Sequence, residues 1–308
     1  MTDLEASMDR LRSVYESDRG AVELIGIGTR AVPALRKFLL LGSPSTVFQP
    51  RMKAVEALAE LGEKDALLAL VRSPIPSSDP AVRFGEEAVR NAALRELVRW
   101  PDVEVGAAVM DIIRERPLRG ACEAAGTLRL LSAAPYLVDA LADDFSRPAA
   151  EEALRCMLPE AKALLIEASV KMAMPDLHNE DPASWRRANA ALHLLKEAEL
   201  VETDFPSLSP LLDSDDPETV TSAASLLLKS PRTERLRIAA ATLRVLPDAS
   251  WFVRDEMREV LAACGPDAVA PIEATIARRM AMANGEPSRD PVLPMLVNLS
   301  RQIKEHSQ

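Results

Sequence analysis

The sequence predicts an all-α protein, a right-handed α-solenoid of about seven to eight helix–turn–helix repeats. One template recurs in seven stretches: a basic residue, an Ala-rich apolar segment, a break about eleven residues on, and a second apolar segment. Because such a helix pair cannot bury its apolar face alone, neighbouring copies must stack. No stretch alternates apolar and polar residues as a strand would. Only 11 of the 308 residues are aromatic, which leaves an interior of Leu, Val and Ala suited to close helix packing.

A single solenoid is expected over residues 1–308, and residues 1–20 form its N-terminal cap. The spacing of apolar residues predicts one amphipathic helix over Leu4–Glu16. The apolar stripe of this helix consists of Leu4, Met8, Leu11 and Tyr15.

The repeats occupy residues 21–280 and recur about every 34 residues. Pro148 and Thr221 occupy the leading position in two copies. Polar, Pro-rich insertions lengthen two of the steps, at 73–80 and 175–182, and are predicted loops. In the other five copies the leading residue is an arginine: Arg51, Arg90, Arg119, Arg187 and Arg254.

Local residue chemistry agrees with helix–turn–helix units. Asp79-Pro80 and Asp216-Pro217 each pair an N-cap residue with a proline at the first helical position. Gly62 and Gly265 follow apolar segments, where a helix C-terminus favours a residue that tolerates positive φ. These positions predict two helix starts and two helix ends.

Residues 281–308 are predicted to close the array. A polar loop at 284–290 precedes a closing helix over 291–304, and residues 305–308 are expected to fray. Terminal elements of a stack differ from central ones because their outer faces meet water.

The clearest copy contains Val253-Arg254, Cys264-Gly265 and the run Asp-Ala-Val-Ala-Pro-Ile at 267–272; residues 28–35 are a second partial match. This pattern resembles the HEAT-like repeat family, in particular its short, phycobilisome-lyase-type repeats, over about residues 20–280. The resemblance implies a solenoid, and the family includes scaffolds, adaptors, a few lyases and a DNA-glycosylase branch. Armadillo and tetratricopeptide arrays are the alternatives, although the Trp–Leu–Gly–Tyr pattern of the latter is missing.

The resemblance also implies a structural role for the leading arginines. In the family this residue is typically buried against an aspartate of a neighbouring unit, so that a ladder runs along the stack. The ladder would be interrupted at Pro148 and Thr221. Its members here would be Arg51, Arg90, Arg119, Arg187 and Arg254.

The chain carries a net charge of −10, and no third of it is basic. Phosphate neutralisation supplies most of the affinity of nucleic-acid-binding proteins, so no nucleic-acid partner is expected. Arg114, Arg116 and Arg119 form the tightest basic cluster. It could bind phosphate, but a helix C-terminal turn, which favours cations, is the preferred interpretation.

Between Lys196 and Lys229 there are eight acidic residues and no basic one. This stretch is a candidate site for a basic segment of a protein partner. Alternatively, its aspartates cap a helix and the remaining acids lie on a solvated face. The candidate partner-binding acids are Glu197, Glu199, Glu202, Asp204, Asp213, Asp215 and Asp216.

Trp185 and Trp251 lie two repeat steps apart, each just before a leading arginine. We predict that both pack at a helix entrance. The alternative is a stacking or cation site, which would resemble the glycosylase branch of the family.

No pattern indicates a catalytic, cofactor or metal site. Glycine-rich phosphate loops and nucleophile elbows are missing, and the histidines are too scattered for zinc. The cysteines are widely spaced among apolar residues, as buried thiols in a reducing compartment would be. These residues are His178, His193, His306, Cys122, Cys156 and Cys264.

We therefore expect a non-catalytic, cytoplasmic and monomeric scaffold or adaptor, which binds a protein partner along a concave groove formed by the second helices of its repeats. No secretory segment opens the chain, and no run approaches the ~20 apolar residues of a membrane span. The alternative is a lyase-like or glycosylase-like enzyme that acts in the groove near Trp185 and Trp251.

Overall fold

The computed structural model describes residues 3–42, 46–75, 79–170, 182–230, 234–282 and 290–306. Every regular element within these ranges is a helix, as predicted, and none is a strand. The chain divides into two compact units, Met1–Met157 (unit 1) and Leu158–Gln308 (unit 2). Outside the described residues lie His178 and parts of the three predicted loops, at 76–78, 175–181 and 284–289.

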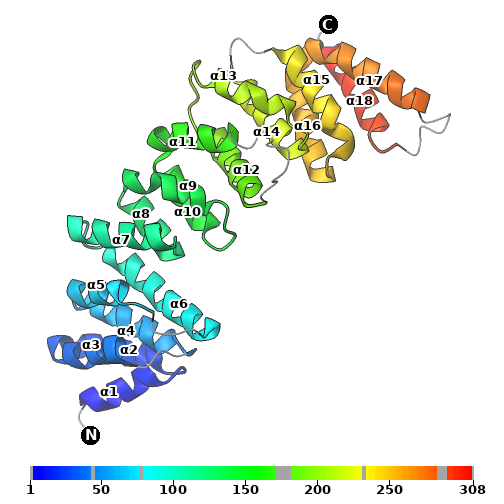
Figure 1. Cartoon of the computed structure of the whole chain (residues 1–308). Helices are drawn as coiled ribbons and strands as arrows, with labels where there is room; N and C mark the ends of the chain where they lie inside the picture. The colour runs from blue at the N-terminus through cyan, green and yellow to red at the C-terminus, as the bar shows by residue number, and fades with distance from the viewer. Residues whose placement is uncertain are drawn as a thin grey trace. The chain divides into compact units, whose positions relative to one another are not determined.

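Unit 1 consists of helices in two rows, which can be followed in Figure 1 from α1 to α10. The helices α2, α4, α6, α8 and α10 pack each on the next, and α3, α5, α7 and α9 form the other row. The short 3-10 helices η1 and η2 lead into α3 and α9. The bounds are α1 (Asp3–Arg12), α2 (Ser17–Ile27), η1 (Gly28–Ala31), α3 (Val32–Leu41), α4 (Gln49–Glu60), α5 (Lys64–Arg72), α6 (Pro80–Leu97), α7 (Val103–Glu115), α8 (Arg119–Thr127), η2 (Leu131–Ala133), α9 (Ala134–Ala140) and α10 (Arg147–Arg155).

Unit 2 repeats this arrangement. Here α12, α14, α16 and α18 pack each on the next, and η3, α15 and α17 form a second row (Figure 1). Helix α11 packs on α12 and α13. The bounds are α11 (Leu158–Val170), α12 (Pro182–Glu197), α13 (Phe205–Leu208), η3 (Ser209–Asp213), α14 (Pro217–Leu227), α15 (Arg235–Val245), η4 (Leu246–Asp248), α16 (Trp251–Cys264), η5 (Gly265–Ala268), α17 (Val269–Met282) and α18 (Leu293–His306).

Both predicted N-caps are confirmed. The carboxylate of Asp79 accepts a hydrogen bond from the backbone N–H of Ala81 at 2.8 Å. Asp216 accepts one from the N–H of Thr219, also at 2.8 Å. Each aspartate therefore satisfies one of the amides that a helix leaves unbonded in its first turn.

The predicted glycine turns are confirmed as well. Gly62 and Gly265 end helices with φ of 80° and 61°, a region that a side chain disfavours. Gly28 adopts 75° at the end of α2. Three helix pairs in the described chain thus turn on a glycine.

The two runs that carry the repeat signature, 28–35 and 265–272, fold alike. Each begins with a glycine at positive φ, continues as a 3-10 turn (η1 or η5), and enters the second helix of a pair. In both runs the fourth and eighth residues are completely buried: Ala31, Leu35, Ala268 and Ile272. The turn therefore fixes the direction in which the next helix buries its apolar face.

Unit 1 relies on glycine for its closest helix contacts. Gly20, Gly120 and Gly126 face α1, α6 and α10 respectively. A Cβ atom at any of the three would lie within 2.7 Å of a backbone Cα in the facing helix, closer than two carbons can approach. These three helix pairs can therefore approach so closely only because no side chain stands at the crossing.

The two ends differ from the prediction. Helix α1 stops at Arg12 instead of Glu16, because the chain turns at Ser13, whose N–H bonds to Arg10 O at 3.0 Å. Tyr15 consequently leaves the apolar stripe and is exposed. Helix α18 continues to His306, where fraying was expected, and Lys304 in its last turn pairs with Glu273 of α17.

The cysteines also divide. Cys122 and Cys264 are buried, as predicted, whereas Cys156 is exposed, which corrects that prediction. The physical reason is its position, since Cys156 follows the last residue of α10 and no longer lies on its buried face.

One stretch of the described chain, Trp251–Met282, is long and apolar enough to cross a membrane by length and composition alone. Gly265, with its positive φ, divides this stretch into α16 and α17. Helix α16 packs on α14 and α15, and α17 packs on α15 and α18. The stretch is therefore a helix pair of unit 2.

Candidate functional site

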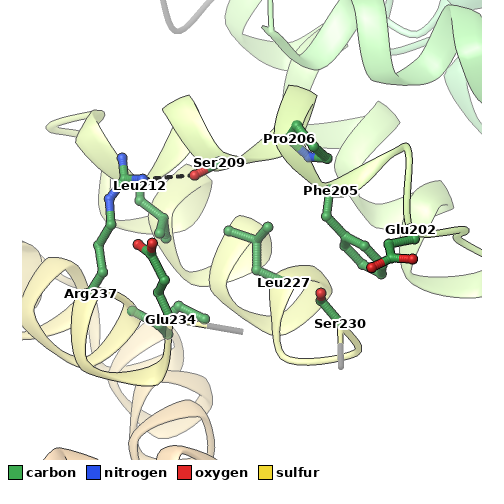
Figure 2. Close-up of a pocket in the computed structure, with 10 residues that line it drawn as sticks. Glu202, Phe205, Pro206, Ser209, Leu212, Leu227, Ser230, Glu234 and Arg237 are labelled. Carbon is green, nitrogen blue, oxygen red and sulfur yellow. Dashed lines mark hydrogen bonds between the residues drawn. The ribbon is translucent and has the colours of Figure 1, made fainter. Parts of the chain in front are cut away.

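Unit 2 contains a cavity of about 260 Å³, here called the acidic pocket (Figure 2). It opens between α13, η3, the end of α14 and the start of α15. Its lining residues are Glu202, Phe205, Pro206, Ser209, Leu212, Leu227, Ser230, Glu234, Arg237 and Ile238.

The floor of the acidic pocket is apolar. Phe205, Leu212, Leu227 and Ile238 are all buried residues that also belong to the core of unit 2. They are held in place because α13 and η3 run directly into each other and pack on α14, while α15 packs on η3. The floor therefore offers rigid apolar surface to a side chain that enters from solvent.

The charged groups that line the pocket are one arginine and two glutamates. Arg237 is already bound, because its guanidinium donates to Ser209 Oγ at 2.8 Å and to Asp213 Oδ2 at 3.0 Å. Glu202 and Glu234 are exposed, and Figure 2 shows their carboxylates on opposite sides of Leu227. Glu234 stands at the N-cap position of α15 without a capping bond from its side chain. The pocket thus presents two carboxylates around an apolar floor.

Several of the predicted partner-binding acids have structural partners inside unit 2. Lys162 lies 2.8 Å from the Asp204 carboxylate, which also accepts from the backbone N–H of Val201. Burial alone would raise the pKa of Asp204, but the bonds from Lys162 and Val201 outweigh it, so this pKa lies below its usual value. Asp204 therefore ties α11 to the start of α13.

Three further acids of the predicted set are engaged in the same way. Asp213 pairs with Arg237 at 3.0 Å, and Asp215 pairs with Arg244 at 2.7 Å. Asp216 caps α14. The remaining members of the set, Glu197, Glu199 and Glu202, are exposed, and among them only Glu202 lines the acidic pocket.

Glu234 was missed by the sequence analysis. It lies beyond Lys229, outside the acidic stretch, and reaches the pocket because α15 packs on η3. The available signal was its place directly before an apolar helix, which alone does not distinguish a solvated residue from a site residue.

The two predicted tryptophans lie on different helices. Trp185 is in the first turn of α12, and Trp251 is the first residue of α16. Both are exposed, and the Trp251 ring lies edge-to-face with Phe252 at a centroid distance of 5.9 Å. The packing of these rings at a helix entrance stays a prediction, and so does the alternative, an enzymatic groove near them.

Two members of the predicted arginine ladder are buried in unit 1. Arg51 forms an ion pair with Glu86 of α6 and donates to the carbonyl of Leu39 at 2.8 Å. Arg90 donates to the carbonyl of Ser73. Burial lowers the pKa of Arg90, an effect that the nearby charge of Glu86 opposes. The carboxylate partner of Arg51 is thus a glutamate, where an aspartate was expected.

Backbone carbonyls are the acceptors that these arginines share. Arg254 donates to Pro247 O at 3.1 Å, and Arg147, beside the predicted gap at Pro148, donates to Leu141 O at 3.1 Å. Each carbonyl lies at or near the end of the preceding helix, where backbone acceptors lack partners within the helix. The arginines therefore complete these helix ends.

The other ladder positions differ from this description. Arg119 is exposed and pairs with Glu123 of its own helix at 3.0 Å. Arg187 is half-buried in α12, with its Nε atom buried. Thr221, at a predicted gap, donates to Pro217 O of its own helix at 2.6 Å.

The described residues contain no group of three or more His, Cys, Asp or Glu side chains that could hold a metal ion. His193 lies 3.7 Å from Glu218, and this interaction is the largest cause that lowers the pKa of the Glu218 carboxyl. A scan against known protein families gives no match, and no curated protein sequence is significantly similar to the chain.

Proposed function

We propose that this chain is a non-catalytic α-solenoid of about seven to eight HEAT-like repeats, which forms a right-handed superhelix and binds a protein partner. The second helices of the repeats form the binding face, and a basic residue of the partner enters the acidic pocket. The acidic pocket agrees with this assignment because α13, η3 and α15 occupy the positions of second helices.

The observation that carries the proposal is the arrangement of Glu202 and Glu234 around a buried apolar floor. Lysine and arginine have an apolar stem and a charged tip, so one such side chain can cover the floor and reach a carboxylate. The guanidinium of Arg237, which also lines the pocket, is bound by Asp213 and Ser209.

A selection from a random peptide library of roughly twelve residues, displayed on phage, tests the proposal with the full-length chain. We expect enriched peptides that carry lysine or arginine beside an apolar residue. Their affinity should fall roughly tenfold in the double variant Glu202→Gln/Glu234→Gln, because both counter-charges are lost.

The matched control is Glu259→Gln, the same change at an exposed position of α16 in the same unit. This variant should bind the basic peptides as the wild type does. Failure of the selection to enrich basic peptides, or equal binding of the enriched basic peptides by the wild type and the double variant, would refute the proposal.

A further inference from the structure

Unit 1 has a row of three phenylalanine rings at its surface, of which Phe84 and Phe145 are exposed and Phe48 is half-buried. Phe84 of α6 lies edge-to-face with Phe48 on one side and with Phe145 on the other, at centroid distances of 6.1 Å in both cases. Phe48 directly precedes α4, and Phe145 lies in the turn before α10. The three rings therefore lie near the starts of α4, α6 and α10.

This use of aromatic residues is unusual for the chain. It contains only six phenylalanines, and half of them gather at this one place on the surface. Phe84 is 50% exposed and Phe145 is 69% exposed. Contiguous exposed apolar surface of this kind marks interaction sites, and aromatic residues dominate the binding energy at such sites.

The rings border a cavity of about 240 Å³, here called the aromatic groove. Met52, Pro117 and Leu118 supply further apolar lining between the rings. The groove is roomy enough for a large apolar side chain. Its walls come from one face of α6 and from the starts of α4, α8 and α10, and these helices pack each on the next.

The charged side chains of the groove differ in their exposure to solvent. Arg116 pairs with Glu87, and its side chain is 61% exposed against 13% for the glutamate. Arg119 and Arg95 share Glu123, and Arg119 is 53% exposed against 29% for this carboxylate. Glu87 and Glu123 are thus less exposed than the guanidinium groups that they pair with, whereas Asp143, which also lines the groove, is exposed and accepts from Ser146. Each guanidinium carries five N–H groups, so Arg116 and Arg119 keep donors beyond those that bond to Glu87 and Glu123.

We propose that the aromatic groove is a docking site for a segment of a partner protein in which a large apolar side chain is flanked by carboxylates. The apolar side chain enters between Phe48, Phe84 and Phe145, and the carboxylates accept from the outward N–H groups of Arg116 and Arg119. Aromatic residues and arginine are the residue types enriched in binding hot spots.

The observations favour a protein segment over a nucleic-acid strand. The three arginines that line the groove, Arg95, Arg116 and Arg119, each share a carboxylate of this chain. A strand needs several phosphates neutralised along its length, whereas one or two carboxylates of a peptide need only the remaining donors.

This inference goes beyond the function proposed above, because it concerns a different unit and ligands of the opposite charge. The same phage-displayed random peptide library tests it, with the full-length chain as the target. Enriched peptides should carry Leu, Met or Phe next to Asp or Glu, and the variant Phe84→Ala should bind them roughly tenfold more weakly.

Two further variants separate the contributions. Arg116→Gln/Arg119→Gln should weaken binding of the acidic peptides and flatten its dependence on salt, because the charge pairs are lost. Phe252→Ala, the same truncation at an exposed ring in unit 2, should leave their affinity unchanged. Circular dichroism of Phe84→Ala should show the wild-type melting curve within a few degrees, as expected for a half-exposed side chain.

Three outcomes would overturn the inference. The first is that no peptide class is lost in Phe84→Ala. The second is that the peptides lost in that variant are basic. The third is that a single-stranded oligonucleotide displaces the acidic peptides from the groove, which would assign it to nucleic acid. Because the acidic-pocket variants lie in unit 2, failure here leaves the first proposal standing, and the reverse also holds.

Discussion

The two units bury different polar groups beneath the same helix packing. Unit 1 buries Arg51, Glu86 and Arg90, and these are the buried charged residues of the described chain. Among the described residues of unit 2, the buried polar side chains are hydroxyls and one amide, for example Thr221 and Thr242. The difference lies in where the polar contacts go.

In unit 2 the buried hydroxyl of Thr219 donates to Asn189 Oδ1 of α12 at 3.2 Å. Three other buried hydroxyls, those of Ser169, Thr221 and Thr242, bond within their own helices. Thr242 donates to Ile238 O at 2.9 Å, and Ser169 donates to Leu165 O at 2.8 Å. Such a side chain needs no partner on a neighbouring helix. Arg51, in contrast, requires both Glu86 of α6 and a carbonyl of α3. The comparison teaches that unit 1 buries charged contacts between its helices, whereas the polar groups that unit 2 buries are neutral and several of them need no neighbouring helix.

The two cavities differ in the charge that they present to a partner, and the two proposals differ accordingly. The acidic pocket of unit 2 presents Glu202 and Glu234. The aromatic groove of unit 1 presents Arg116 and Arg119, each more exposed than the carboxylate with which it pairs. A scaffold with both sites would select partners by opposite charges at its two units.

The largest effect is expected from Glu86→Ala. The guanidinium of Arg51 then stays buried without its counter-charge, which should lower the unfolding free energy of unit 1 by about 3–5 kcal/mol. Thiol labelling in a Cys156→Ser background measures the two units separately, because Cys122 is buried in unit 1 and Cys264 in unit 2. Labelling of Cys122 should accelerate, and that of Cys264 should not.

The matched control for this change is Glu273→Ala, which removes an exposed ion pair with Lys304 in unit 2. It should cost less than about 1 kcal/mol. If Glu86→Ala exposes both thiols at the same rate, the two units unfold together and the comparison between them fails.

A smaller loss is expected when a glycine contact of unit 1 is filled. In Gly126→Ala the new methyl group would meet the Ala153 backbone, so the helices α8 and α10 must separate, at a cost of about 1–3 kcal/mol. Gly26→Ala is the control, since a Cβ there meets no atom within 4 Å. It should stabilise α2 by about 0.5–1 kcal/mol. Urea denaturation measures both changes, and equal signs would contradict the argument.

Thr242→Val should change stability by less than about 1 kcal/mol, although the residue is completely buried. The carbonyl of Ile238 keeps its helical N–H bond, so the change leaves no polar group unpaired. Thermal unfolding checks this prediction. A loss as large as that of Glu86→Ala would show that unit 2 also depends on its buried polar groups.

The smallest effect concerns pH and should be the same in both units. Burial raises the pKa of the Cys122 thiol from 9.0 to about 12 and that of Cys264 from 9.0 to about 11. As the pH rises through 9, the unfolded thiols lose protons that the folded ones retain, so stability falls with pH. Each thiol should lower the unfolding free energy at pH 9 by about 0.4 kcal/mol. Comparing unfolding free energies at pH 7 and pH 9 for the wild type, Cys122→Ala and Cys264→Ala measures the two contributions. A rise in stability with pH that depends on either cysteine would be contrary to this sign.

Part of the fold could be predicted because its causes are local. The caps at Asp79 and Asp216 bond to amides two or three residues away, and the turns at Gly62 and Gly265 depend on φ alone. Arg119 shows the limit of this approach. It shares a repeat register with Arg90, yet the residue of α8 that faces Asn91 of α6 is Gly120. Adjacent residues on a helix point in different directions, so Arg119 is exposed.

The candidate sites were predicted in part. The acidic stretch contains Glu202, but its aspartates could not be separated from binding residues, because the partners of Asp213 and Asp215 lie on α15. The sequence identified Arg116 and Arg119 as members of a basic cluster, but it did not indicate that phenylalanine rings lie beside them.

The sequence by itself determined that the chain is helical, which residues end several helices, and which residues form the apolar faces. Those properties follow from hydrogen bonds and side-chain spacing within a few residues. Only the tertiary structure decided that Arg51 meets Glu86, that Glu234 joins Glu202, and that three phenylalanines form one row. These groups lie on separate helices, and their distances depend on how closely the backbones approach, which glycines such as Gly120 and Gly126 set through contacts far apart in the chain.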